Sequence, residues 1–302
     1  MTGRLLAPLL ALILITLVGM PHARADASAD AMAAVSAEQK RRAAWLWEQR
    51  IWRTRADDVL DRAQELKIDT LFIALDIRKG NIRYLMALTR FLRAAHKRGV
   101  AVLAVEGDPH MVQPGGQPNA IARAETIRNY QLSAVRRERL AGLQYDIEPY
   151  ALPNFDIDNP NHLRKWSDTY RLLRQAFARR LDIVLPFWIA DKPAGAEFVR
   201  RAAAHANGFT VMAYRTKSDR IISAATPILQ LGEELGRPVR VALELGPTNE
   251  GPGVSFEGDL PALRKAMRET LPVLARRKSF AGFAIHGITW PGQDDAATVR
   301  RR

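Results

Sequence analysis

Residues 141–150, Ala-Gly-Leu-Gln-Tyr-Asp-Ile-Glu-Pro-Tyr, decide the fold of this chain. A short apolar run ends in two acidic residues, Asp146 and Glu148, and a proline follows at once. This pattern is typical of a buried parallel strand whose carboxyl end carries polar groups. Amphipathic helical patterns precede and follow it, at Ala120–Arg139 and His162–Arg180. The stretch therefore predicts one strand of a repeating strand–helix architecture.

The same pattern recurs along the rest of the chain. The eight predicted strand runs are Ala43–Trp52, Thr70–Asp76, Val100–Glu106, Gly142–Glu148, Asp182–Ile189, Phe209–Tyr214, Val239–Leu245 and Ala281–Thr289. The other predicted helices are Asp57–Leu66, Ile82–Lys97, Gly195–Ala206, Asp219–Leu235 and Leu260–Arg277.

Eight strands with seven intervening helices are what a closed barrel needs, so we predict an α/β protein with a single (β/α)₈ TIM barrel. The rival is a doubly wound open sheet, which normally has a glycine-rich loop after its first strand. Residues 53–56, Arg-Thr-Arg-Ala, contain no glycine at that point. The pattern leaves no room for a second domain.

The N-terminus predicts export. Arg4 precedes an apolar run from Leu5 to Met20, and Ala23-Arg24-Ala25 has small residues where a signal peptidase cleaves. We therefore expect a signal peptide at 1–25, a polar leader at 26–40 and the barrel domain at 41–302. The expected localisation is periplasmic or extracellular, without stable membrane insertion after cleavage.

The composition narrows the partners. The net charge of +13 favours acidic partners such as an anionic polysaccharide. The chain has no nucleic-acid-binding motif, and nucleic acid is not expected as a partner. With no Cys, and with no His motif or calcium loop, we expect neither a metal nor another cofactor.

The carboxyl ends of the strands carry the candidate chemistry, because active sites of this fold lie there. Asp146 and Glu148 are two residues apart and point the same way along the strand. Two carboxyl groups so close cannot both ionise freely, so one pKa is expected to rise, as a general acid requires. The alternative is an ion pair that closes the barrel, with Arg215 or His286 as the partner.

Several other strand-end residues are candidates for binding a substrate. We expect Trp188 and Trp290 to contact sugar, since a pyranose ring stacks on an indole, and Trp45 and Trp47 to belong to the core. The remaining candidate contacts are Asp76, Glu106, Gln144, Arg215 and His286.

The residues at these strand ends resemble family 18 glycoside hydrolases, the chitinases and endo-β-N-acetylglucosaminidases. Residues 141–148 are similar to the alternating-Asp motif that ends in the catalytic Glu of that family. Met212-Ala213-Tyr214 resembles the Met-x-Tyr-Asp motif of the sixth strand. Trp290 resembles the Trp at the floor of the central sugar subsite. Gln144 and Arg215 stand where the family has Asp.

The resemblance implies that Glu148 protonates the glycosidic oxygen. It further implies that Asp146 orients the substrate's own 2-acetamido group, that Tyr214 donates a hydrogen bond to it, and that Trp290 stacks on the sugar. A second mechanism stays open, because many barrel glycosidases have a carboxylate nucleophile on strand seven. Glu244 lies there, and it could otherwise pair with a loop arginine.

The sequence thus predicts a secreted or periplasmic glycoside hydrolase that cleaves a bacterial polysaccharide by general acid/base catalysis. The catalytic candidates are Glu148, Asp146, Tyr214 and Glu244. The alternative from another class is a non-catalytic glycan-binding protein on a glycosidase-like barrel. A metal-dependent esterase or phosphodiesterase is a third possibility, which sensitivity to a chelator would reveal.

Overall fold

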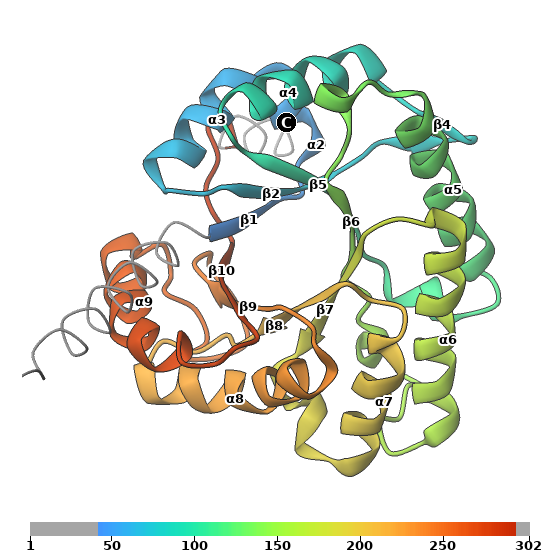
Figure 1. The fold of residues 1–302 in the computed structure, drawn as a ribbon. Coiled ribbons are helices and arrows are strands. Elements are labelled where there is room, and N and C mark those ends of the chain that lie inside the picture. The colour runs from blue at the N-terminus through green and yellow to red at the C-terminus, as the bar shows by residue number, and fades with distance from the viewer. Residues whose placement is uncertain (1–41, 294–302) are drawn as a thin grey trace, which may run out of the picture.

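The computed structural model describes residues 42–293. Within them, eight parallel strands close into one barrel in the order β1-β10-β9-β8-β7-β6-β5-β2 (Figure 1). The strands are β1 (Arg42–Leu46), β2 (Thr70–Ala74), β5 (Ala101–Glu106), β6 (Gly142–Tyr145), β7 (Leu181–Pro186), β8 (Gly208–Met212), β9 (Val239–Glu244) and β10 (Phe280–His286). The predicted single (β/α)₈ barrel is confirmed. The predicted signal peptide and leader lie outside the described residues.

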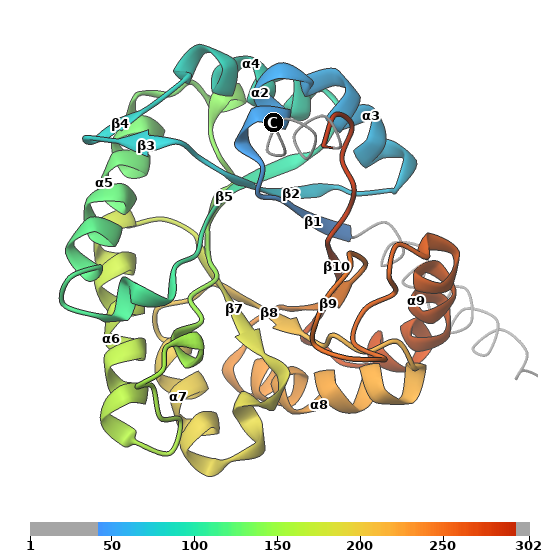
Figure 2. The same cartoon turned by 180° about the vertical axis from the view of Figure 1, so that it is seen from behind.

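Helices surround the barrel on all sides, as both axial views show (Figures 1 and 2). They are α2 (Gln49–Thr54), α3 (Ala56–Glu65), α4 (Leu85–Lys97), α5 (Gln117–Ser133), α6 (Pro160–Phe177), α7 (Pro193–Ala203), α8 (Ser218–Leu235) and α9 (Leu260–Leu274). Four short 3₁₀ helices lie in the loops: η1 (Pro109–Val112), η2 (Arg136–Glu138), η3 (Pro149–Ala151) and η4 (Phe187–Asp191). A two-stranded hairpin, β3 (Ile77–Arg78) with β4 (Asn81–Ile82), follows β2.

The first predicted strand, Ala43–Trp52, is too long. The strand ends at Leu46, and α2 begins at Gln49 and buries Ile51 and Trp52. An apolar run of this length does not distinguish a buried strand from a short buried helix. The fourth strand is likewise shorter than predicted and ends at Tyr145, although the amide of Asp146 still donates to the carbonyl of Glu106 at 2.8 Å.

Local signals explain where the helices begin and end. The side chain of Asn159 accepts a hydrogen bond from the first turn of α6, and Asp259 does the same for α9; each cap is followed within two residues by a proline. Capping oxygens satisfy amide groups that the helix leaves open. Helix α8 ends at Gly236, whose φ of 62° is the left-handed conformation that favours glycine.

The barrel interior is a packed core rather than a channel. Large side chains of neighbouring strands, Trp45 and Phe72, face small ones, Ala43, Ala242 and Ala284, and all are buried. Alternation of large and small residues fills the barrel up to the level where the strands end. The site described below lies above this layer.

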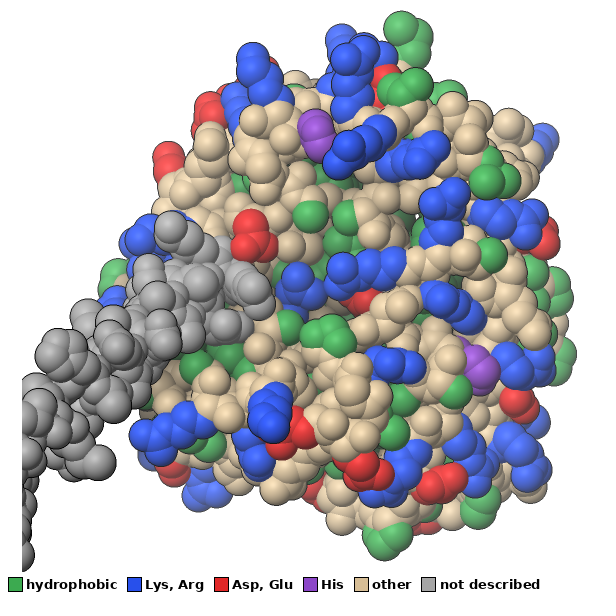
Figure 3. Space-filling model, viewed as in Figure 1, with side chains coloured by type: hydrophobic (Ala, Val, Ile, Leu, Met, Phe, Trp, Pro, Cys, Tyr) green, Lys and Arg blue, Asp and Glu red, His purple; other side chains and the backbone are tan. Residues whose placement is uncertain are grey.

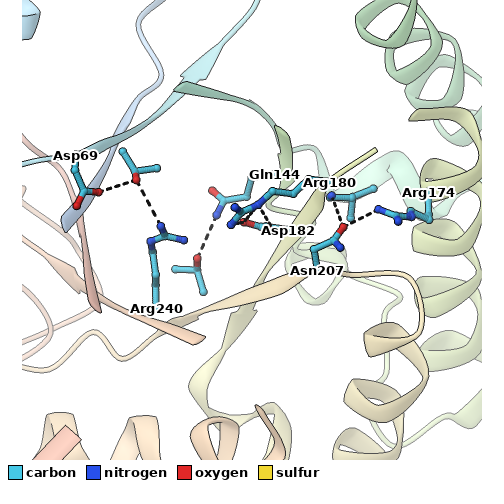
Figure 4. A network of polar contacts seen from close by, with 10 residues as sticks. Asp69, Gln144, Arg174, Arg180, Asp182, Asn207 and Arg240 are labelled. Atoms are coloured by element: carbon cyan, nitrogen blue, oxygen red, sulfur yellow. Dashed lines mark hydrogen bonds and ion pairs between the residues drawn. The ribbon is translucent and has the colours of Figure 1, made fainter. Parts of the chain in front are cut away.

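The interior also holds a polar layer (Figure 4). Gln144 accepts a hydrogen bond from the indole of Trp45 at 2.9 Å and donates one to the hydroxyl of Thr210 at 3.2 Å. Next to it, the buried carboxylate of Asp182 pairs with Arg180 at 2.9 Å. Buried polar groups need such partners. Gln144 is fully buried, so its predicted contact with substrate has no support in this position.

The surface carries charges of both signs. Figure 3 shows Lys and Arg side chains spread over the face seen in Figure 1, with Asp and Glu among them. Within residues 42–293, no helix has the length and apolar character that crossing a membrane requires.

Candidate active site

A cavity of about 580 Å³ opens at the carboxyl ends of the strands. It is lined by residues that follow or end five strands: Trp47 after β1, Asp146 and Glu148 after β6, Tyr214 after β8, Glu244 at the end of β9 and His286 at the end of β10. The loop after β9 adds Glu250 at the rim. The topology thus gathers all four predicted catalytic residues around one space.

Asp146 and Glu148 form the centre of the cavity. Burial raises the pKa of Asp146 from 3.8 to about 7, and the charge of Glu148 adds to this. One oxygen of Asp146, Oδ1, is buried without a hydrogen-bond partner. Burial also raises the pKa of Glu148, against the opposing effect of a hydrogen bond from Tyr150. A pKa of about 7 lets Asp146 hold a proton near neutral pH, and the pKa of Glu148 is shifted in the same direction, which is the direction that a general acid requires.

Two tyrosines cover the carboxyl groups. The hydroxyl of Tyr150, on η3, is hydrogen-bonded to Glu148, and burial together with the charge of Glu148 raises its own pKa. Burial and the nearby carboxylates, Asp146 first, raise the pKa of Tyr214 well above its ordinary value. Both phenols therefore stay protonated at neutral pH and can act as hydrogen-bond donors. Tyr214 lines the cavity, whereas the ring of Tyr150 packs edge-on against Trp188.

A second polar chain runs through Glu244, His286 and Trp47. Nδ1 of His286 lies 2.5 Å from Oε2 of Glu244, and the indole of Trp47 donates to Nε2 of His286 at 3.2 Å. A neutral ring with its proton on Nδ1 satisfies both contacts. Burial lowers the pKa of His286, but the hydrogen bond and charge of Glu244 outweigh it, so the net direction is upward. Protonation of Nε2 would oppose the Trp47 contact, since two donors would then meet.

Glu244 is held on both oxygens. Oε1 accepts the amide of Gly246 at 2.8 Å, Oε2 contacts His286, and only 9% of the side chain is exposed. Gly287 packs so closely that a Cβ there would lie 2.2 Å from Oε1. These contacts fit a residue that orients His286 better than a nucleophile, which would need a free oxygen. The partner is a histidine, not the loop arginine considered from the sequence.

Glu106 and Asp76 lie away from the cavity. Glu106 is buried and forms a two-pronged ion pair with Arg123 of α5, at 2.7 and 2.8 Å. Arg123 also donates to the carbonyls of Leu75 and Ile77, so the pair ties α5 to the loop after β2. Asp76 pairs with Arg78 in that loop at 3.0 Å. Both acids have structural partners, and neither lines the cavity where substrate contact was expected.

The predicted sugar-binding tryptophans are also placed elsewhere. Trp290 is 2% exposed, and its indole donates to the carbonyl of Trp45 at 3.0 Å. Trp188 packs against Tyr150 behind the cavity. Arg215 lies 4.3 Å above the ring of Phe187 and does not line the cavity. None of these three side chains lines the cavity, so the expectation that they contact sugar there gains no support from their positions.

Trp47 is the tryptophan that lines the cavity. Its side chain is 37% exposed, whereas its neighbour Trp45 is 3% exposed and lies in the core. The prediction that both belong to the core is therefore wrong for Trp47. Alternation gives Trp47 the same direction as Trp45, toward the barrel interior, but Trp47 follows the end of β1 and so lies above the packed interior, at the cavity. An exposed indole beside carboxyl groups is a suitable platform for a sugar ring.

Sequence reasoning missed two further residues of the site. Tyr150 follows Glu148 in a Pro-Tyr turn, and the proline had marked that segment only as a loop. Glu250 lies within the long loop after β9 rather than at the end of a strand, and its charge raises the pKa of Glu148. The position of Tyr150, two residues after Glu148, was a signal in the sequence that could have identified it as part of the site. The sequence carried no such signal for Glu250.

The described lining of this cavity contains four carboxyl groups and a histidine but no Lys or Arg. Among residues 42–293, no group of three or more His, Asp or Glu side chains is arranged to hold a metal ion.

Comparisons with known proteins show similarity in the fold but not in the sequence. No protein-family model and no curated protein matches the chain. A GH18 chitinase from Pseudoalteromonas aurantia aligns with a TM-score of 0.55 at 13% identity, covering 87% of this chain and 100% of the chitinase. An endo-β-N-acetylglucosaminidase from Cordyceps militaris aligns at 0.51 and 13% identity, covering 85% of both chains.

A GH113 β-1,4-mannanase aligns with a TM-score of 0.51 at 12% identity, over 82% of this chain and 87% of the mannanase. The resemblance noted in the sequence is thus confirmed at the level of the fold. The chain has the (β/α)₈ barrel that these glycoside hydrolases share.

Proposed function

We propose that this protein is a glycoside hydrolase of retaining, substrate-assisted type that acts on a polysaccharide containing 2-acetamido sugars. The observation that carries the proposal is the pair Asp146 and Glu148, set two residues apart in a cavity at the carboxyl end of β6, with raised pKa values. The proposal includes export to the periplasm or the extracellular space, which rests on the signal-peptide pattern of residues 1–25.

Glu148 is the proposed general acid. In the first step it gives its proton to the glycosidic oxygen as the bond from C1 to that oxygen breaks. The carbonyl oxygen of the substrate's acetamido group then bonds to C1, which keeps the charge within the sugar. In the second step Glu148 removes a proton from water as the water attacks C1 and restores the acetamido group. Attack from opposite sides in the two steps leaves the anomeric configuration retained.

Asp146 and Tyr214 are the proposed partners of the acetamido group. Asp146 has an unpartnered oxygen, and the amide N–H of that group is a donor that could satisfy it. The phenol of Tyr214 stays protonated and can donate to the carbonyl oxygen, which holds that oxygen in place to attack C1. The engaged oxygens of Glu244 support this mechanism over a carboxylate nucleophile on β9.

The experiment compares the purified mature protein with Glu148→Gln in an assay for new reducing ends. Substrates are chitin oligomers, peptidoglycan glycan strands and acidic exopolysaccharides. We expect hydrolysis of at least one by the wild type and a loss of about 10²–10⁴-fold in the variant, which is the usual contribution of a general acid. A proton NMR time course of the product then shows whether the configuration is retained.

The matched control is Glu257→Gln, because Glu257 is an exposed glutamate of the loop after β9 that does not line the cavity. This control should keep wild-type activity. Binding of a glycan by wild type and Glu148→Gln alike, without release of reducing ends from any substrate, would refute the hydrolase and leave a glycan-binding barrel.

A further inference from the structure

A second cavity, of about 170 Å³, lies next to the carboxylate cavity. The two cavities have no lining residue in common, but the same two segments of the chain line both. The 3₁₀ helix η1 contributes Pro109 to the carboxylate cavity and Val112 to the second one, and the loop after β6 contributes Ala151 and Leu152 in the same way. A chain molecule held at Glu148 can therefore extend over these segments into the second cavity.

The lining of the second cavity suits a sugar ring. Val112, Leu152 and Phe155 provide apolar surface, and the ring of Phe155 is braced by His162, stacked at 5.4 Å, and by Trp166, edge-on at 5.9 Å. Apolar and aromatic walls with a few polar groups are the usual composition of a small-ligand site. A braced aromatic ring loses little conformational entropy when it contacts a ligand.

The polar side chains of this lining include one cation and no acid; they are Lys165, His162, Gln113 and Asn154. Lys165 is exposed on α6 and, within the described residues, has no ion-pair partner. Nδ1 of His162 accepts the amide of Asp156 at 2.9 Å, so in the neutral ring the proton sits on Nε2, which is a donor. No Asp or Glu of the described chain lines this cavity.

The two aspartates of the same loop are engaged elsewhere. Asp156 accepts the amide of Asp158 at 2.9 Å, and Asp158 pairs with Lys192 at 2.6 Å. They leave Lys165 without a neutralising partner. The first cavity is lined by carboxyl groups without Lys or Arg, whereas this one has the opposite character. An acidic substituent on the glycan is therefore repelled by the first cavity and attracted by the second.

We propose that the second cavity is a distal subsite that binds a carboxylate-bearing sugar unit of the same glycan chain, with Lys165 paired to the carboxylate and Phe155 against the ring. This rests on the proposed function and adds to it the substrate class: an acidic glycan whose charged unit lies beyond the point of cleavage. It also requires a substrate long enough to occupy both cavities.

The experiment uses two tetrasaccharides that differ in this one feature. One is the chitin tetramer, which is neutral. The other is a peptidoglycan tetrasaccharide of alternating N-acetylglucosamine and N-acetylmuramic acid, whose lactyl groups carry carboxylates. A chitin disaccharide with a chromogenic leaving group, too short to reach the second cavity, completes the set. kcat/KM is measured for wild type, Lys165→Met and Arg164→Met. Arg164, an exposed neighbour on α6 outside the cavity lining, provides the matched control.

We expect Lys165→Met to lower kcat/KM for the acidic tetrasaccharide about tenfold, as the loss of one charged hydrogen bond does, and to leave both neutral substrates unchanged. The ratio of the wild-type kcat/KM for the acidic tetrasaccharide to that for the chitin tetramer should fall as salt is added, because salt screens the charge of Lys165. Arg164→Met should behave as wild type. Equal losses on all three substrates, or no loss on any, would overturn the proposal.

A binding measurement separates this inference from the hydrolase proposal. Calorimetry with the acidic tetrasaccharide is done on wild type and Lys165→Met. If no substrate is cleaved but the wild type binds this tetrasaccharide about tenfold more tightly than the variant, the subsite stands and the hydrolase fails. Equal binding by the two proteins, or binding by neither, overturns the subsite.

Discussion

Replacing Asp146 with Asn should make the stability of the protein depend less on pH. The pKa of this carboxyl group rises from 3.8 to about 7 on folding, mainly because burial disfavours its charge. The folded state therefore holds the proton more tightly than the unfolded chain at any pH between these two values. The protonated Asp146 contributes its full stabilisation of the wild type below pH 3.8. This contribution is lost as the pH rises toward about 7. Asn cannot ionise, so the variant lacks this loss.

The magnitude follows from the two pKa values. Their difference corresponds to about 4 kcal/mol if it is fully expressed. Asp146 lines an open cavity, so solvent screens part of its charge, and we expect about 2 kcal/mol. The free energy of unfolding of Asp146→Asn, relative to wild type, should thus increase by about 2 kcal/mol between about pH 4 and about pH 8.

The assay is urea unfolding followed by circular dichroism at several pH values in that range. Taking the difference between variant and wild type cancels the titration of groups that do not contact Asp146. The control is Asp191→Asn, since Asp191 is exposed in the folded chain and its environment changes little on unfolding. A flat difference for Asp146→Asn, the same as for the control, would refute the view that this carboxyl group is buried and protonated.

Three further predictions concern the surroundings of this pair. Gly287→Ala should lower kcat/KM by about tenfold or more, since the new Cβ would meet Oε1 of Glu244 at 2.2 Å; a thermal melt near that of wild type with unchanged activity would contradict this. Tyr150→Phe should raise the pKa of Glu148 by removing a hydrogen bond to its charged form, so the alkaline limb of the kcat/KM profile should move to higher pH. Glu106→Gln should destabilise the fold by about 3 kcal/mol in urea unfolding, because it removes the negative charge that balances the guanidinium of Arg123 in a buried ion pair. The pH profile of activity should keep its shape.

The strand-end pattern selected the two carboxyl groups that lie at the centre of the cavity, Asp146 and Glu148, but also several residues that do not line it. Asp146 and Glu148 were recognisable because two acids at the end of an apolar strand are costly unless they are used or paired. The same argument selected Glu106, which is paired with Arg123 of α5. Sequence alone does not tell a paired acid from a functional one, because the partner lies 17 residues away on another element.

The aromatic residues show a similar limit. Trp290 had the position of a sugar platform in the eighth strand run, but its indole turns to the carbonyl of Trp45 and is buried. Trp47 had the position of a core residue, but it reaches the cavity because β1 ends at Leu46 and α2 begins shortly afterwards. The direction of one side chain past the end of a strand depends on loop geometry, which apolar periodicity does not encode.

The sequence by itself determined the barrel and the strand that carries the acid, because eight apolar runs with intervening amphipathic helices fit one closed parallel sheet. It also determined that Asp146 and Glu148 share a direction, since alternation along a strand is a local property. Only the tertiary structure decided which acids meet. The pairing of β9 with β10 brings Glu244 to His286, and the packing of α5 brings Arg123 to Glu106. The turn η3 places the hydroxyl of Tyr150 within hydrogen-bonding distance of Glu148. Those pairings depend on strand order and loop packing, and they separate the groups that serve the fold from those free to meet a substrate.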